Sequence, residues 1–205
     1  IFSKLENGNA SDKKLNNTVL TDISRKLASV GIDPAGSIYI ADSALVTEDN
    51  LSLMGDETLF ITRLPATFGE HQRAIEETVQ KQAWHDYGIL ATTAPTRNRP
   101  GVYYRGHETT VTLYGRTYRA VVTHTRVLTI EHRPIYARGR PKADGNRTLK
   151  EMRHAIKGAL RQKPEAINTM REQAGCFVLI TNVPVEGPPD SNVPYDGKKI
   201  LQAYK

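Results

Sequence analysis

Cysteine is nearly absent from this sequence of 205 residues, which contains only Cys176. A single cysteine excludes an internal disulfide and a cage of several thiolates around a metal ion. Because Cys176 precedes the apolar run Phe177-Val178-Leu179-Ile180, we expect it to pack as a small hydrophobic side chain. This cysteine usage fits a reducing compartment, and we expect a cytoplasmic protein.

Long apolar runs are also missing, since none approaches the roughly 20 residues that a membrane-spanning helix needs. We therefore expect no membrane partner. The six histidines include no pair at metal-ligand spacing, so we expect each to be structural or solvated. The sequence also lacks a glycine-rich phosphate loop before a helix and a Gly-x-Ser-x-Gly nucleophile elbow.

Positive charge, in contrast, is plentiful and unevenly spread. The chain has a formal net charge of +6 and a pI near 9.4. Residues 97–142 contain ten basic and two acidic residues, a local charge of +8. Such a field attracts polyanions and makes nucleic acid the leading partner. A solvated surface of charged side chains remains the alternative interpretation.

Apolar periodicity in the first third of the chain predicts alternating helices and strands. Apolar residues recur every three or four positions over residues 13–30, which indicates an amphipathic helix that ends at Gly31. Residues 37–41 are β-branched and apolar, as expected of a strand buried on both faces. A helix over 47–54 and a strand over 58–62 follow, in a doubly wound pattern.

In the remainder of the chain, the sequence predicts antiparallel strands in addition to helices. Residues 101–125 read as antiparallel strands joined by a turn at Tyr114-Gly115. We also expect a helix over 69–84 and a basic connector over 133–146. After the connector we expect a helix over 149–170 that Pro164 divides. A strand over 176–181 and the start of a helix at 200–205 complete the prediction.

Asp42, at the carboxyl end of the strand predicted over 37–41, is the leading candidate for a chemical role. In open α/β sheets, reactive groups gather at the carboxyl ends of the strands. A carboxylate held there, followed by the small Ser43 and Ala44, can bind a hard divalent cation through oxygen. The competing interpretation is that Asp42 only caps the following turn.

Several short motifs follow one another along the chain. They are Gly8-Asn9-Ala10-Ser11-Asp12, Ile40-Ala41-Asp42-Ser43-Ala44-Leu45, Glu48-Asp49-Asn50-Leu51, Arg63-Leu64-Pro65, Gly139-Arg140-Pro141-Lys142, Phe177-Val178-Leu179-Ile180-Thr181-Asn182, Ile200-Leu201 and Tyr204-Lys205. In their order and spacing these motifs resemble the DDE transposases of bacterial insertion sequences, in the subgroup whose ribonuclease H-like core is interrupted by a β-rich insertion. The resemblance covers residues 5–65 and 137–205 well, and between them mainly the hairpin 115–125. It implies a protein associated with the nucleoid.

The resemblance implies an α/β fold with a ribonuclease H-like mixed sheet and helices. Residues 1–65 and 176–205 would form the core, and 66–175 the β-rich, partly helical insertion. Asp42 corresponds to the second catalytic aspartate. The first would precede Ile1 and the catalytic glutamate would follow Lys205, so the chain reads as an internal fragment that is inactive by itself.

The activity implied by the resemblance is DNA strand cleavage and strand transfer at the ends of an insertion sequence. Two Mg²⁺ ions bridged by the three acids would drive this chemistry, on double-stranded DNA and within a homodimer. Two other functions stay open. One is a non-catalytic DNA-binding remnant of a decayed element, and the other is a ribonuclease H-like nuclease without strand transfer.

Several basic residues are candidates for contacts with DNA. Arg138, Arg140 and Lys142 lie in an Arg-Gly-Arg-Pro-Lys string that resembles the core of an AT-hook, although a plain basic linker is the alternative. Arg116 and Arg119 lie on the predicted hairpin, where they could follow a DNA backbone. Asp12 is a possible accessory acid, which helix capping would also explain.

Overall fold

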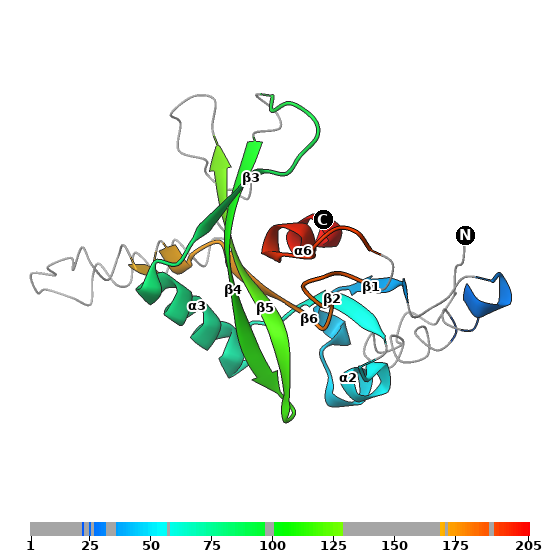
Figure 1. Ribbon diagram of the computed structural model, residues 1–205. Helices are drawn as coiled ribbons and strands as arrows, with labels where there is room; N and C mark the ends of the chain where they lie inside the picture. The colour runs from blue at the N-terminus through cyan, green and yellow to red at the C-terminus, as the bar shows by residue number, and fades with distance from the viewer. Residues whose placement is uncertain are drawn as a thin grey trace, which may run out of the picture.

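The computed structural model describes residues 22, 25, 27–31, 36–56, 58–96, 101–128, 169–170, 172–188 and 191–205. These residues form a mixed α/β fold built on a six-stranded sheet with helices on both faces (Figure 1). The elements are β1 (Ile38–Ala41), the 3₁₀ helix η2 (Ser43–Leu45), α2 (Glu48–Met54), β2 (Leu59–Arg63), α3 (Gly69–Lys81), β3 (His85–Ile89), β4 (Gly101–Leu113), β5 (Arg116–Leu128), β6 (Cys176–Thr181) and α6 (Gly197–Tyr204).

Strands β1 and β2 are parallel and are connected through α2. Thr47 caps α2 by accepting a hydrogen bond from the amide of Asn50, and Glu48 and Asp49 lie at the positive end of the helix. The helix ends at Gly55, whose φ of 57° favours glycine. The helix predicted over 47–54 and the strand over 58–62 are confirmed to within one residue.

The other strand pairs are antiparallel, and the strand order is β1-β2-β6-β5-β4-β3. β4 and β5 form a long hairpin closed at Tyr114 and Gly115, whose φ angles of 51° and 77° fit the turn predicted there. β5 pairs with β6, so strands from the predicted insertion continue the same sheet. The boundaries 66 and 175 stay a prediction.

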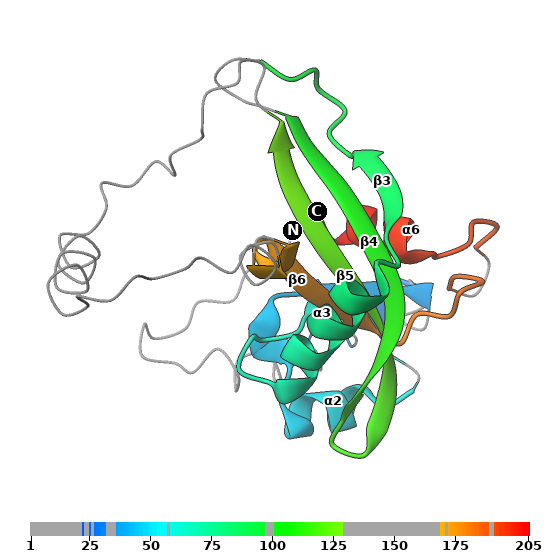
Figure 2. The same cartoon turned by 90° about the vertical axis from the view of Figure 1, so that its left-hand side faces the viewer.

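Two hydrophobic cores lie on opposite faces of the sheet. Figure 2 shows α3 in front of the sheet, with α6 on the far side. α2 and α3 cover the face that contains Phe60 and Val178, while α6 packs Ile200 and Leu201 against the other face. Because both faces are covered, β2 and most of β6 are buried, as their apolar sequences predict.

The start of α6 is held against the sheet by polar contacts. Asp196 caps the helix by accepting from the amide of Lys199, and Glu108 on β4 accepts from the amide of Gly197. Arg119 on β5 donates to Glu108 and to the carbonyl of Tyr195. With these contacts, α6 begins at Gly197, three residues before the start predicted at residue 200.

Some sequence predictions were wrong in detail. β1 is not buried on both faces, because it is an edge strand among the described residues and Ile40 is 51% exposed. α3 ends at Lys81 and not at residue 84, since Gln82 adopts a left-handed conformation with φ of 49°. Strand β3 was not predicted.

Other predictions lie mainly outside the described residues. In the helix predicted over 13–30, residues 22, 25 and 27–29 are helical, and Gly31 has a φ of 75°. The connector over 133–146 is not described, and nearly all of the helix over 149–170 is not described either. Within the described part of the chain, no helix is long and apolar enough to cross a membrane.

Candidate functional site at the end of strand β1

Asp42 directly follows β1 and is exposed to solvent. Its carboxylate Oδ1 accepts a hydrogen bond of 2.9 Å from the amide of Ala44 and caps η2. Its carbonyl accepts a hydrogen bond of 2.6 Å from the hydroxyl of Thr62 at the end of β2. The capping role is therefore confirmed. The same contacts fix the backbone of Asp42 at the edge of the sheet while its side chain faces solvent.

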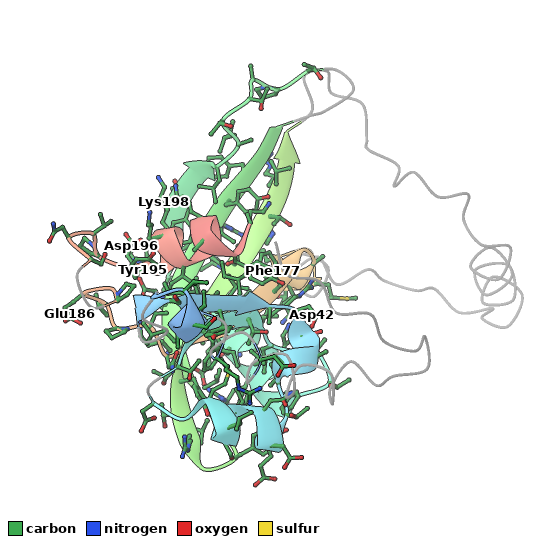
Figure 3. The ribbon with its side chains drawn as sticks, turned by 90° about the vertical axis from the view of Figure 1, so that its right-hand side faces the viewer. Asp42, Phe177, Glu186, Tyr195, Asp196 and Lys198 are labelled. Atoms are coloured by element: carbon green, nitrogen blue, oxygen red, sulfur yellow. The ribbon has the colours of Figure 1, made fainter. Side chains whose placement is uncertain are left out.

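Arg63 lies next to Asp42 in the register of the two parallel strands. Ala41 pairs with Thr62, so Asp42 and Arg63 occupy the next positions at the carboxyl ends of β1 and β2. The guanidinium of the exposed Arg63 lies 5.2 Å from the ring centroid of Phe177. Asp42 and Phe177 appear on the same side of the molecule in Figure 3.

The charge of Arg63 also reaches the other face of the sheet. Burial lowers the pKa of His71 on α3, and the charge of Arg63 lowers this pKa further. His71 is therefore held neutral close to a fixed cation. The end of β2 thus carries positive charge at the strand position next to Asp42.

Asp42 fits a Mg²⁺ site only as a single oxygen ligand. Among the described residues there is no group of three histidine, cysteine or acidic side chains that could hold a metal ion. One carboxylate does not make a stable site for Mg²⁺, which binds through carboxylates together with substrate phosphates and water. The described residues alone therefore do not complete the metal centre that the resemblance implies.

The hairpin arginines have different environments. Arg119 donates to Glu108 over 2.7 Å, to the carbonyl of Val183 over 2.6 Å and to that of Tyr195 over 3.0 Å. These contacts give Arg119 a structural role that leaves few of its donors for DNA. Arg116 lies 3.9 Å from the exposed Asp56 and remains accessible. The other candidates, Asp12, Arg138, Arg140 and Lys142, lie outside the described residues.

A cluster of aromatic and basic side chains beyond the end of α3 was missed by sequence reasoning. The guanidinium of Arg105 lies 4.4 Å from the ring centroid of Trp84, which also contacts the ring of His124 edge-on at 5.8 Å. Burial and the charge of Arg105 lower the pKa of His124. The members are far apart in sequence, so only the pairing of β4 with β5 could have revealed the cluster.

Cys176 packs against the core on the α3 face, as its sequence context predicts. Its thiol donates to the carbonyl of Glu172 over 3.2 Å. Burial raises the pKa of the thiol to about 11, so the thiol stays protonated and unreactive at neutral pH.

Comparisons of the chain with protein-family models, with curated proteins and with solved structures found no match.

Proposed function

We propose that the chain is part of a transposase catalytic core, in which Asp42 is one ligand of a Mg²⁺ centre that cuts and joins DNA. The fold would be ribonuclease H-like, with a β-rich insertion. The observation that carries the proposal is the exposed carboxylate at the carboxyl end of β1, beside β2 in a parallel pair connected through a helix. The resemblance of the motifs around Asp42 to DDE transposases adds to this support.

The remaining carboxylates of the metal centre would come from outside the described residues. Mg²⁺, when bound, supplies activation of a water or a 3′-hydroxyl group and stabilises the leaving oxygen of the phosphodiester. Asp42 would contribute a negative charge from a fixed backbone. The turn after β1 is held by the hydrogen bonds that Asp42 accepts from the amide of Ala44 and from the hydroxyl of Thr62. Arg63 attracts the DNA phosphate to the same edge of the sheet.

The experiment is a cleavage and strand-transfer assay on insertion-sequence ends with the full-length protein. Asp42→Asn should reduce cleavage by at least about a thousandfold, since removing a metal ligand removes several kcal/mol of transition-state stabilisation. Binding of the DNA ends should change little. Asp49→Asn is the matched control, because Asp49 is an exposed acid in the first turn of α2. Retained cleavage in Asp42→Asn contradicts the proposal.

A further inference from the structure

A cleft of about 630 Å³ opens where the end of α6 meets the start of β4 and the segment that follows β3. Figure 1 shows α6 beside β4. The volume lies within the range of about 300–1,000 Å³ that is typical of sites for small ligands. The lining residues are Leu90, Ala91, Thr92, Thr93, Pro95, Gly101, Val102, Tyr104, Gln202 and Lys205.

The polar groups of this cleft match an anion. Lys205 brings an ammonium group, Thr92 and Thr93 bring hydroxyls, and Gln202 brings an amide, while none of the described side chains that line the cleft is acidic. The ammonium of Lys205 donates to the hydroxyl of Tyr104 and lies 4.2 Å from the centroid of its ring. Tyr104 is only 4% exposed, so the cation rests on a fixed surface.

The lining of the cleft also includes the apolar side chains of Leu90, Pro95 and Val102. An inorganic anion would leave these apolar side chains and most of the volume unused. A phosphate attached to a flat, partly apolar group can contact both the polar and the apolar residues of the lining. Phosphate also has several acceptor oxygens, which can receive hydrogen bonds from an ammonium and from hydroxyls at the same time.

We propose that this cleft binds a nucleoside 5′-phosphate, with the phosphate at Lys205, Thr92 and Thr93 and the nucleoside against Leu90 and Val102. A free nucleotide and the 5′-phosphorylated end of a DNA strand present this same chemistry. The site is separate from Asp42 and does not depend on the proposed function.

The first test is calorimetric titration of the chain with deoxyadenosine 5′-phosphate. We expect saturable binding of the nucleotide and none of deoxyadenosine. Lys205→Met should weaken binding at least about tenfold, which is the effect of losing one charge-assisted hydrogen bond. Lys198→Met, an exposed lysine on the same helix that does not line the cleft, should stay within about twofold of the unchanged chain.

The second test replaces the free nucleotide by a short DNA strand with a 5′-phosphate or a 5′-hydroxyl. Binding of the free nucleotide supports a nucleotide site. Binding of the 5′-phosphorylated strand alone supports a strand-end site. The proposal is overturned if neither ligand binds saturably, if deoxyadenosine binds as well as its phosphate, or if Lys205→Met binds as the unchanged chain does. Because Lys205 is exposed, an unchanged melting temperature will show that the variant is folded.

Discussion

At the scale of single residues, Asn182 shows how one side chain can complete a strand. Its carboxamide oxygen accepts from the amide of Phe60 over 2.8 Å, and its amide group donates to the carbonyl of Thr58 over 2.9 Å. β2 and β6 pair only over Ile61, Thr62 and Arg63 on the β2 side. Before these residues, the side chain of Asn182 provides the partners of the Phe60 amide and the Thr58 carbonyl. Asn182 therefore replaces missing strand pairing.

Removing this side chain should destabilise the whole sheet. Asn182→Ala leaves a donor and an acceptor without partners, and we expect the free energy of unfolding to fall by about 2–3 kcal/mol. Urea unfolding measures the change. Gln72→Ala is the control, since this exposed side chain makes a hydrogen bond to Glu76 on the same helix. A loss as small as that of the control would contradict the role given to Asn182.

The candidate site could be predicted from sequence only in part. The position of Asp42 directly after a strand was predictable because its signal is local: a short apolar run followed by an acid and two small residues. Arg63 is visible in the sequence only as part of a motif, because its position next to Asp42 depends on the pairing of β1 with β2. The closeness of Trp84, Arg105 and His124 likewise depends on long-range strand pairing.

At the scale of elements, the attachment of α6 to the sheet depends on a close approach at Gly197. A Cβ atom at this position would overlap the hydroxyl of Tyr87 and press on the side chain of Glu108. The pKa of Tyr87 is raised by burial and by the nearby charges of Glu108 and Asp196, so this hydroxyl remains protonated. Tyr87, Glu108 and Gly197 therefore form a tight junction between β3, β4 and α6.

The junction predicts a specific pair of variants. Gly197→Ala should lower the free energy of unfolding by about 1–3 kcal/mol, as overpacking of a buried site does. Tyr87→Phe removes the overlapping hydroxyl, so the double variant should recover part of this loss. A double-mutant cycle from urea unfolding gives the coupling. Additive effects of the two substitutions would contradict the close approach.

Elements with strong local signals were predictable, and those shaped by their neighbours were not. Helix α2 has a cap, an acidic first turn and a terminal glycine, all visible in the sequence. β3 was missed because His85, Asp86 and Gly88 interrupt its apolar character, and its pairing with β4 compensates for this. β1 has the composition of a central strand, yet it lies at the edge of the described sheet.

At the scale of the whole molecule, three histidines favour folding at neutral pH. The pKa values of His71, His107 and His124 are lowered, in each case mainly by burial. The unfolded chain, with histidine pKa values near 6.5, therefore binds protons more readily than the folded chain. The stability from these neutral side chains is complete above pH 6.5 and is lost as the pH falls below that value.

The free energy of unfolding should accordingly be lower at pH 5.5 than at pH 7.5. Urea unfolding across this window measures the effect. Most carboxylates remain ionised there, so their contribution changes little. His124→Gln should flatten the dependence, because it removes one of the three groups. A free energy of unfolding that is constant, or that rises toward pH 5.5, would contradict the burial of the three rings.

The parallel pair of β1 and β2 was foreseeable from the order of apolar segments. The assignment of the whole mixed sheet to a ribonuclease H-like core stays a proposal, tied to the chemistry proposed at Asp42. The most direct measurement is a crystal structure of the full-length protein with Mn²⁺, located by its anomalous scattering. The account predicts a Mn²⁺ ion about 2.1 Å from a carboxylate oxygen of Asp42, together with further acidic ligands. Mn²⁺ bound at other acids, with the Asp42 carboxylate only capping η2, would contradict it.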